Sequence, residues 1–276
     1  MNEKEYLQSY DDTKYAKPSV TADISIFTIS DDNGGSSRKL MPKKLRILMI
    51  KRGRHPYMGM YALPGGFVRP NETLEQAAVR ELKEETGVEC GFLKQVRVFS
   101  GINRDPRRWV ISCSFMALLD GRKFNVSGGD DAESAEWFDI TFKEVYTAQE
   151  EIMWELALEN RSVSLTATIK QAHFDSLRFE YPDFEIVKSD GIAFDHALII
   201  AHSLFTLRRL IRVSDIAFEL LPEQFTLSEL QKIYETVLDK ELLTPAFRRS
   251  VAGLVEETGQ FETNVKHRPS KLFKKR

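Results

Sequence analysis

The feature that most constrains this chain is the 23-residue stretch 66–88, in which a glycine turn leads into one short, carboxylate-rich helix. Thr73 is a good N-cap, and Gln76 three residues later completes a capping box. Gly87 offers the left-handed residue with which many helices end. An apolar stripe lies between these signals, formed by Leu74, Ala77, Ala78 and Leu82. The sequence therefore predicts one short amphipathic helix that starts after Thr73 and ends at Gly87.

Three glutamates, Glu81, Glu84 and Glu85, lie at positions i, i+3 and i+4 and therefore project from one side of this helix. They lie near the negative end of the helix dipole, where cations would be favoured. Arg80 can offset part of this charge by pairing with Glu84 or with Glu72. One interpretation is a solvated acidic face. The other is a site for a hard cation such as Mg²⁺ or Mn²⁺, which prefers oxygen ligands.

The spacing of this stretch resembles the Nudix box. Gly66, Glu72 and the run from Arg80 to Val88 match it at all nine specified positions. Resemblance to the Nudix family implies an α/β/α sandwich with a mixed sheet. It also implies Mg²⁺- or Mn²⁺-dependent cleavage of nucleoside diphosphates linked to another moiety, in which the metal neutralises pyrophosphate oxygens and activates water.

The same resemblance assigns roles to individual residues. It implies a metal site built from the Gly65 carbonyl, Glu81, Glu84 and Glu85, and a catalytic set that adds Arg80 and Glu72 to the three glutamates. Arg80 and Glu72 would be the ion pair that orients the metal ligands. A catalytic base often comes from a loop outside the box, and Asp130, Asp131 and Glu133 are the acidic residues of the loop 121–134. The sequence does not select one of them.

Length and composition limit the remaining possibilities. A chain of 276 residues is longer than a usual single domain, so two domains are expected. No run approaches the roughly 18 apolar residues of a membrane span, and the charged N-terminus lacks an apolar signal core. Cys90 and Cys113 have no metal-site spacing and read as reduced thiols of a cytoplasmic protein.

Hydrophobic patterning predicts the other elements of the first domain. Strands are expected at residues 20–30, 44–51, 91–100, 109–119 and 137–139. A helix is expected at about residues 142–159. Residues 162–190 look like an insertion, in which 162–169 and 179–187 pair as a hairpin.

A turn between two of these strands carries Arg104 and Arg107 on either side of Asp105-Pro106. One interpretation is a solvated turn, since Asp-Pro is a good turn former. The other is that one arginine reaches a substrate phosphate or stacks on an adenine ring. Upstream, Gly65 and Gly66 permit a tight turn that presents backbone groups towards the metal and phosphates.

From Phe194 onward, the sequence pattern changes from strands to helices. Residues 196–213 form a long amphipathic pattern that predicts a connecting helix, on which His196 and His202 are expected to be structural. A capping box, Thr226 to Glu229, opens a helix at residues 227–238, and Thr244 as N-cap before Pro245 opens a second at about residues 246–254. A strand–loop–strand at residues 259–273 would then form a wing.

Basic residues gather on this predicted winged helix-turn-helix. From Arg248 to Arg276 there are 8 Lys and Arg against 3 Asp and Glu. Arg248 and Arg249 near the start of the second helix, with Lys266 and Arg268 at the tip of the wing, suit contacts to double-stranded DNA. The alternative is a small helical dimerisation domain with a basic tail.

Several further stretches resemble one Nudix subfamily, the Nudix-related transcriptional regulators of NAD metabolism: residues 61–67 (YALPGGF), 104–107 (RDPR), 193–196 (AFDH), 225–231 (FTLSELQ) and 246–249 (AFRR). This resemblance implies a Nudix domain over residues 1–193, a connecting helix over 194–213 and a winged helix over 214–276. It also implies a homodimer that binds operator DNA and ADP-ribose or a similar nucleotide. The expected ligand contacts are Arg52, Gly66, Phe67, Arg104 and Arg107.

The sequence leaves two functions open. The first is a DNA-binding repressor that responds to ADP-ribose. The second is an ADP-ribose pyrophosphatase whose C-terminal module serves dimerisation or regulation. Pure sensors of this subfamily tend to have eroded boxes, whereas every carboxylate is present here, so hydrolysis stays possible.

Overall fold

The computed structural model describes residues 2–31, 43–87, 91–121, 132–148, 151–171, 182–263 and 269–276. Its main sheet has the order β10-β9-β8-β7-β2-β1-β6-β5, with β3 paired to β2 and β4 paired to β1. These strands are β1 (Ser19–Asp31), β2 (Lys43–Arg52), β3 (Tyr61–Ala62), β4 (Gly65–Phe67), β5 (Phe92–Phe99), β6 (Val110–Leu119), β7 (Ala132–Ala148), β8 (Glu151–Glu159), β9 (Ser164–Gln171) and β10 (Phe184–Asp190). The β1–β6 pair is parallel and the others are antiparallel, so the sheet is mixed, as predicted.

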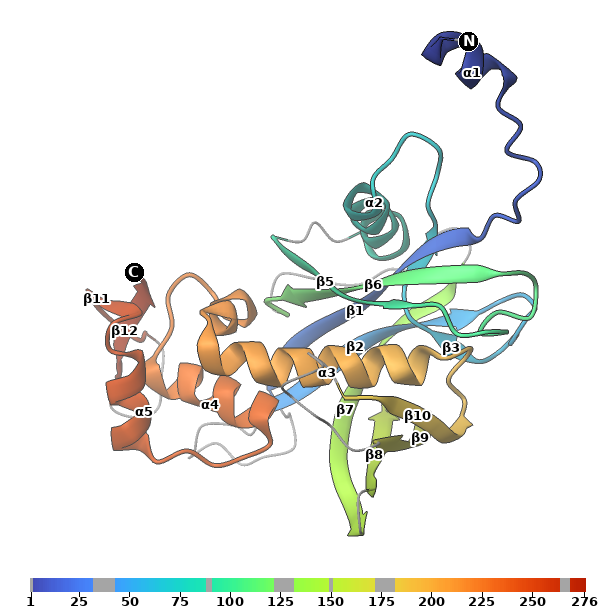
Figure 1. Cartoon of the computed structure of the whole chain (residues 1–276). Helices are drawn as coiled ribbons and strands as arrows, with labels where there is room; N and C mark the ends of the chain where they lie inside the picture. Colours follow the sequence, from blue (N-terminus) through green and yellow to red (C-terminus); the bar gives the residue numbers. More distant parts are fainter. Residues whose placement is uncertain are drawn as a thin grey trace.

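Helices α2 (Leu74–Thr86) and α3 (His196–Val213) cover opposite faces of this sheet (Figure 1). Strand β1 separates them and is buried on both faces, because side chains alternate along a strand. Ile24 and Ile26 pack with the core under α2, and Phe27 and Ile29 pack with the core under α3. The predicted α/β/α sandwich is thereby confirmed.

The prediction of a helix at residues 142–159 is wrong. These residues form the end of β7 and all of β8, which pair as antiparallel strands. The buried side chains of Phe138, Phe142, Leu156 and Leu158 follow a period of two, and Phe142 stacks on Trp154 with centroids 4.7 Å apart. Packing of this alternating face onto the core under α3 decides the structure.

The hairpin expected within residues 162–190 is present as the antiparallel pair of β9 and β10, and residues 172–181 between them lie outside the described part of the chain. Strand β10 is one edge of the sheet and β5 is the other. Each edge pairing contains a register irregularity, between Ile186 and Lys188 in β10 and between Gln95 and Arg97 in β5.

The C-terminal elements form a helix-turn-helix followed by a two-stranded wing. They are η1 (Ile216–Leu220), α4 (Leu227–Leu238), α5 (Thr244–Val251), β11 (Val255–Phe261) and β12 (Lys271–Lys275). The capping box at Thr226 and Glu229 is formed as predicted. Thr244 is not the N-cap of α5, because Leu243 occupies that position and Thr244 is the first helical residue. The helix ends at Val251 and the wing begins four residues later, both earlier than expected.

Helix α3 joins the two parts of the molecule. Its buried apolar residues belong to one hydrophobic cluster that continues into α4 through Leu230, Ile233 and Val237. Arg208 of α3 donates its Nε to the Val237 carbonyl at 3.1 Å. Beside this contact, a cavity of about 440 Å³ lies between β2, β7 and α4. The winged-helix part is therefore held both by α3 and by β2, since Thr236 of α4 donates to the Lys43 carbonyl at 3.5 Å.

The N-terminal helix α1 (Glu3–Ser9) has no buried residue and extends away from the body of the molecule (Figure 1). Among the described residues, no helix is both long and apolar enough to cross a membrane.

His202 lies in the core under α3, between the rings of Phe99 and Phe184, and is 2% exposed. Burial, with a smaller contribution from the Arg97 charge, lowers the pKa of His202 to about 3. The stabilisation that comes from the neutral imidazole is thus complete above about pH 6.5, where the unfolded histidine is also neutral. It is lost as the pH falls from there towards 3.

We therefore expect His202→Gln to flatten the decline in the free energy of unfolding between pH 6.5 and 4.5. A single histidine of this kind contributes up to about 1.4 kcal/mol per pH unit in that range. Denaturant unfolding at several pH values measures it, with the exposed His55→Gln as control. An unchanged slope in the His202 variant would contradict the assignment.

Candidate functional site

The turn that carries Gly65 and Gly66 is pressed between β1 and α2. In β4, Gly65 and Gly66 pair with Asp23 and Ala22 of β1. Gly65 has φ +153°, and a Cβ there would lie 2.3 Å from the Ala22 carbonyl oxygen. A Cβ on Gly66 would lie 2.3 Å from a carboxylate oxygen of Glu81. Only glycines allow this turn to approach both the strand and the helix so closely.

Helix α2 forms as the sequence predicts. Thr73 and Gln76 exchange both hydrogen bonds of the capping box, and Gly87 ends the helix with φ 69°. Ala77, Ala78 and Leu82 are buried against the sheet. This packing fixes which side of α2 carries the glutamates and turns it towards β4.

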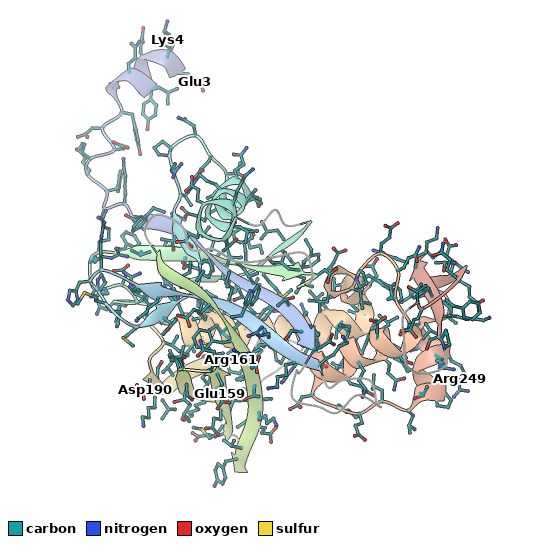
Figure 2. The ribbon with its side chains drawn as sticks, turned by 180° about the vertical axis from the view of Figure 1, so that it is seen from behind. Glu3, Lys4, Glu159, Arg161, Asp190 and Arg249 are labelled. Carbon is teal, nitrogen blue, oxygen red and sulfur yellow. The ribbon has the colours of Figure 1, made fainter. Side chains whose placement is uncertain are left out.

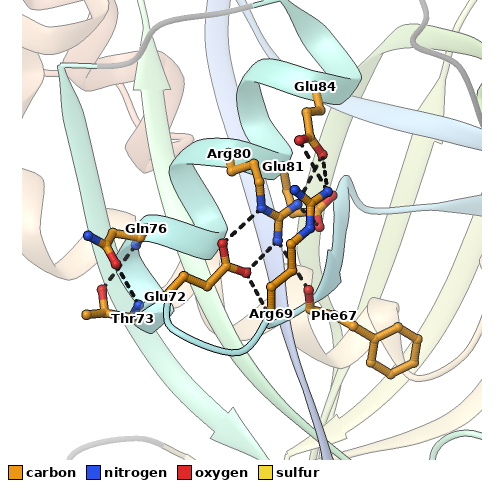
Figure 3. A network of polar contacts seen from close by, with 8 residues as sticks. All are labelled: Phe67, Arg69, Glu72, Thr73, Gln76, Arg80, Glu81 and Glu84. Atoms are coloured by element: carbon orange, nitrogen blue, oxygen red, sulfur yellow. Dashed lines mark hydrogen bonds and ion pairs between the residues drawn. The ribbon is translucent and has the colours of Figure 1, made fainter.

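Arg80 is the centre of the polar network on α2 (Figure 3). Its guanidinium donates to Glu72 at 2.7 and 3.0 Å, to Glu81 at 2.5 Å and to Glu84 at 3.1 Å, and it also reaches the Phe67 carbonyl at 3.2 Å. The hydrogen bonds from Arg80 lower the pKa of Glu72 to about 2 and raise that of Arg80 itself. The predicted Arg80–Glu72 pair is thus formed in a charged, firmly held state.

The three glutamates expected to bind metal are each held by hydrogen bonds, two of them by the same arginine. Glu81 and Glu84 share Arg80, Glu84 also accepts from Arg69, and Glu85 accepts from the Gly65 amide at 2.8 Å. Within the described residues, no three acidic, histidine or cysteine side chains are gathered closely enough to hold an ion. The donor set is nevertheless oxygen-rich and faces the glycine turn, which is the chemistry that suits Mg²⁺ or Mn²⁺.

All five residues expected to contact the ligand line one cavity of about 170 Å³ next to this turn: Arg52, Gly66, Phe67, Arg104 and Arg107. The Arg107 guanidinium lies over the rings of Phe67 and Phe194, 5.6 and 5.7 Å from their centroids. Arg52 lies 4.8 Å from the centroid of Phe194. Arg107 is also hydrogen bonded to Asp105, which raises the pKa of Arg107. The cavity therefore combines aromatic faces with fixed positive charge.

Sequence reasoning did not select Phe194, Asp23 or Asp195 as site residues. Arg104 donates to both oxygens of Asp195, at 2.9 and 2.7 Å, and lies 3.8 Å from Asp23. The sequence signals for Phe194 and Asp195 were their place in the stretch 193–196 (AFDH), which resembles the regulator subfamily, and their position immediately before a predicted helix. Arg104 itself is enclosed, with a side chain only 6% exposed.

His196, the first residue of α3, is hydrogen bonded to the segment that leads into the glycine turn. Its Nδ1 accepts a hydrogen bond from the Leu63 amide at 2.8 Å, and the side chain is buried. Burial lowers the pKa of His196, so that the ring stays neutral and can accept this bond. The structure thus gives His196 the structural role that the sequence suggested.

The residues expected to bind DNA are only partly described. Arg248 and Arg249 are exposed on α5, whose buried face carries Phe247 and Val251. Arg249 lies at the winged-helix end of the molecule, away from Glu159, Arg161 and Asp190 on the sheet (Figure 2). Lys266 and Arg268 lie outside the described residues, as do Asp130 and Asp131 of the loop considered for a catalytic base; the side chain of Glu133 is not described either.

Comparison with known proteins identifies the class first. Residues 39–156 match the family described as NUDIX domain, and residues 217–274 match the NrtR DNA-binding winged helix domain. A MutT/nudix family protein from Enterococcus faecalis has a similar structure, with a TM-score of 0.74 and 26% identity over 100% of this chain and 94% of that one. The chain is thus a Nudix protein with an added winged helix.

The sequence relatives narrow this class. The chain is 30% identical to the "ADPR responsive transcriptional repressor NtrR" of Acinetobacter baylyi, over 99% of this chain and 88% of that protein. It is 46% identical to an ADP-ribose pyrophosphatase of Methanocaldococcus jannaschii over 101 residues, which are 37% of this chain and 59% of that protein. The chain belongs to the NrtR family of Nudix-related regulators. Nudix hydrolases in general use a divalent metal such as Mg²⁺ or Mn²⁺.

The two glycines of the turn should respond differently to substitution. Gly65→Ala places a Cβ against the β1 backbone at a positive φ and is expected to lower the free energy of unfolding by roughly 2–4 kcal/mol. Gly66→Ala meets a side-chain end, the Glu81 carboxylate, whose displacement also disturbs its bond to Arg80, so a smaller loss of about 1–2 kcal/mol is expected. Denaturant unfolding of both variants measures the difference, and equal losses would contradict it.

Proposed function

We propose that this protein is a DNA-binding transcriptional regulator that responds to ADP-ribose or a closely related nucleoside diphosphate derivative and acts on NAD metabolism. The observation that carries the proposal is the presence, on one chain, of a Nudix match followed by an NrtR DNA-binding winged helix match. The full-length similarity to an ADP-ribose-responsive repressor supports it. We place its action in the cytoplasm, where nucleotide and operator are both accessible.

The cavity beside the glycine turn is the proposed nucleotide site. Arg52, Arg104 and Arg107 supply positive charge for the pyrophosphate, and guanidinium groups match phosphate geometry. Phe67 offers an aromatic face to the adenine or ribose, and Gly66 lets the ligand approach the backbone. Phe194 is added to this set because the guanidinium groups of both Arg52 and Arg107 lie over its ring.

We assign the metal site to Glu81, Glu84, Glu85 and the Gly65 carbonyl. When bound there, Mg²⁺ or Mn²⁺ would neutralise pyrophosphate oxygens and lower the pKa of a water molecule. Arg80 and Glu72 orient the helix face, since Arg80 bonds to Glu72, Glu81 and Glu84 together. Ion pairs with Arg69 and Arg80 hold the Glu84 carboxylate on this face of the helix.

We propose that residues 1–193 form the Nudix domain, with residues 162–190 as an inserted hairpin, that 194–213 form the connecting helix, and that 214–276 form the DNA-binding domain. Arg248 and Arg249 would contact double-stranded DNA from α5, with Lys266 and Arg268 at the wing. A homodimer would present two such surfaces to an operator with two half-sites.

A second candidate function is Mg²⁺-dependent ADP-ribose pyrophosphatase activity that releases AMP and ribose 5-phosphate. The complete set of carboxylates on α2 favours it, together with the 46% identity to an ADP-ribose pyrophosphatase over 101 residues. The two functions are compatible, because a slow hydrolase can also act as a sensor.

Replacing Arg248 and Arg249 together with Ala should weaken DNA binding by about tenfold or more and reduce its salt dependence by about two counterions. The probe is double-stranded DNA selected from a random library with the wild-type protein, and anisotropy gives the affinity. ADP-ribose affinity, measured by calorimetry, should be unchanged. The control variant Arg161→Gln/Lys188→Gln loses the same charge from the sheet side. Normal DNA binding by the α5 variant would contradict the assignment.

Replacing Glu84 and Glu85 with Gln is expected to lower Mg²⁺-dependent release of AMP from ADP-ribose by about 100-fold or more, because two carboxylate ligands are lost. Glu75→Gln, an exposed change on the same helix, should leave turnover intact. Full turnover in the double variant would refute the metal site. Absence of turnover in the wild type, with ADP-ribose still altering the DNA complex, would leave the regulator as the sole function.

A further inference from the structure

Asp195 occupies the N-cap position of α3 but does not cap it. An aspartate at this position normally accepts a hydrogen bond from an amide in the first turn of the helix. Thr73 and Thr226 do so at the starts of α2 and α4, with extended backbone angles. Asp195 makes no such bond and has φ −95° and ψ 21°. Both of its carboxylate oxygens accept from Arg104 instead.

Arg104 is held between two acids at the wall of the nucleotide cavity. Besides the bidentate bonds to Asp195, its Nη2 lies 3.8 Å from Asp23. Arg104 and Asp23 both line the cavity in which we place the pyrophosphate. A phosphate group is a strong bidentate partner for a guanidinium. A ligand that places its pyrophosphate here therefore competes with Asp195 for Arg104.

Phe194, the residue before Asp195, lines the same cavity. Phe194 has φ 54°, which is unusual for a bulky side chain. Its ring contacts Tyr57, with centroids 4.6 Å apart, and lies under Arg52. A backbone in such a region persists only where its surroundings hold it. The turn into α3 is thus held by Phe194, which lines the cavity, and by Asp195, which bonds to the cavity residue Arg104.

The opposite end of α3 contacts the winged helix. The helix has 18 residues and is therefore about 27 Å long. Arg208 bonds to the Val237 carbonyl of α4, beside the cavity of about 440 Å³. A change in how α3 begins can thus reach α4 through a single continuous helix that contacts both the nucleotide cavity and α4.

We propose that Asp195 is a two-position switch between the nucleotide cavity and the DNA-binding domain. Without ligand it pairs with Arg104, and with ligand it leaves Arg104 to the pyrophosphate and caps α3. The inference rests on the proposed function, because it concerns how ADP-ribose binding alters DNA binding. The coupling requires that the ligand and the Asp195–Arg104 pair exclude one another.

The test uses the full-length protein with Asp195→Asn and, as a second variant, Asp195→Ser. Both residues can cap a helix, and neither carries the charge that holds Arg104. Free of ADP-ribose, each variant should already have the DNA affinity that the wild type shows with saturating ADP-ribose. Each should bind ADP-ribose more tightly than the wild type. The effect of ADP-ribose on DNA affinity, typically about 5–150-fold in such systems, should fall to about twofold or less.

The controls separate this inference from the proposed function. Asp12→Asn removes an ion pair with Lys17 on the N-terminal segment and should keep the wild-type response. If the wild type itself shows no effect of ADP-ribose on DNA binding, the proposed function fails and the switch fails with it. If the wild type responds and both Asp195 variants respond equally, only the switch is refuted. Loss of ADP-ribose binding by folded variants also refutes it, since Asp195 would then be needed to position Arg104 for the ligand.

Discussion

The burial of both faces of β1 is the constraint on which the rest of the molecule depends. This strand lies between β2 and its parallel partner β6, under α2 on one side and α3 on the other. The same strand carries Asp23 into the cavity and receives the close approach of Gly65. A single strand therefore sets the distance between the carboxylate helix, the glycine turn and the helix that leads to the winged domain.

Charge compensation on α2 follows from that arrangement. Several glutamates on one helix face repel each other, and the core on which α2 packs is a hydrophobic cluster. Arg80 is placed so that one guanidinium serves Glu72, Glu81 and Glu84, while a backbone amide serves Glu85. The acidic face is thereby ordered around one guanidinium and one backbone amide.

Local signals in the sequence predicted the local structure well. Thr73, Gln76 and Gly87 fixed both ends of α2, and the Thr226 box fixed the start of α4, because caps act over a few residues. The prediction of a helix at residues 142–159 was wrong because this apolar run does not define its period clearly, and the alternating side chains of the β7–β8 hairpin pack on the core under α3.

The candidate site shows the same division between local and distant information. Its glycines and glutamates sit in one contiguous motif and could be found from spacing alone. Asp23, Phe194 and Asp195 could not, since their importance arises from contacts with Arg52 and Arg104, which are distant in sequence. A single sequence contains no direct record of such contacts.

The register irregularities at the two ends of the sheet have a consequence for assembly. A regular edge strand offers unpaired amides and carbonyls to a strand from another molecule. Here β5 and β10 are each interrupted, and β10 also carries the exposed Lys188 at its interruption. Extension of the sheet from one copy to the next is thus discouraged at both ends. Two copies of this chain would meet through helices, sheet faces or winged domains, and a continuous intermolecular sheet is the least suitable way for them to associate.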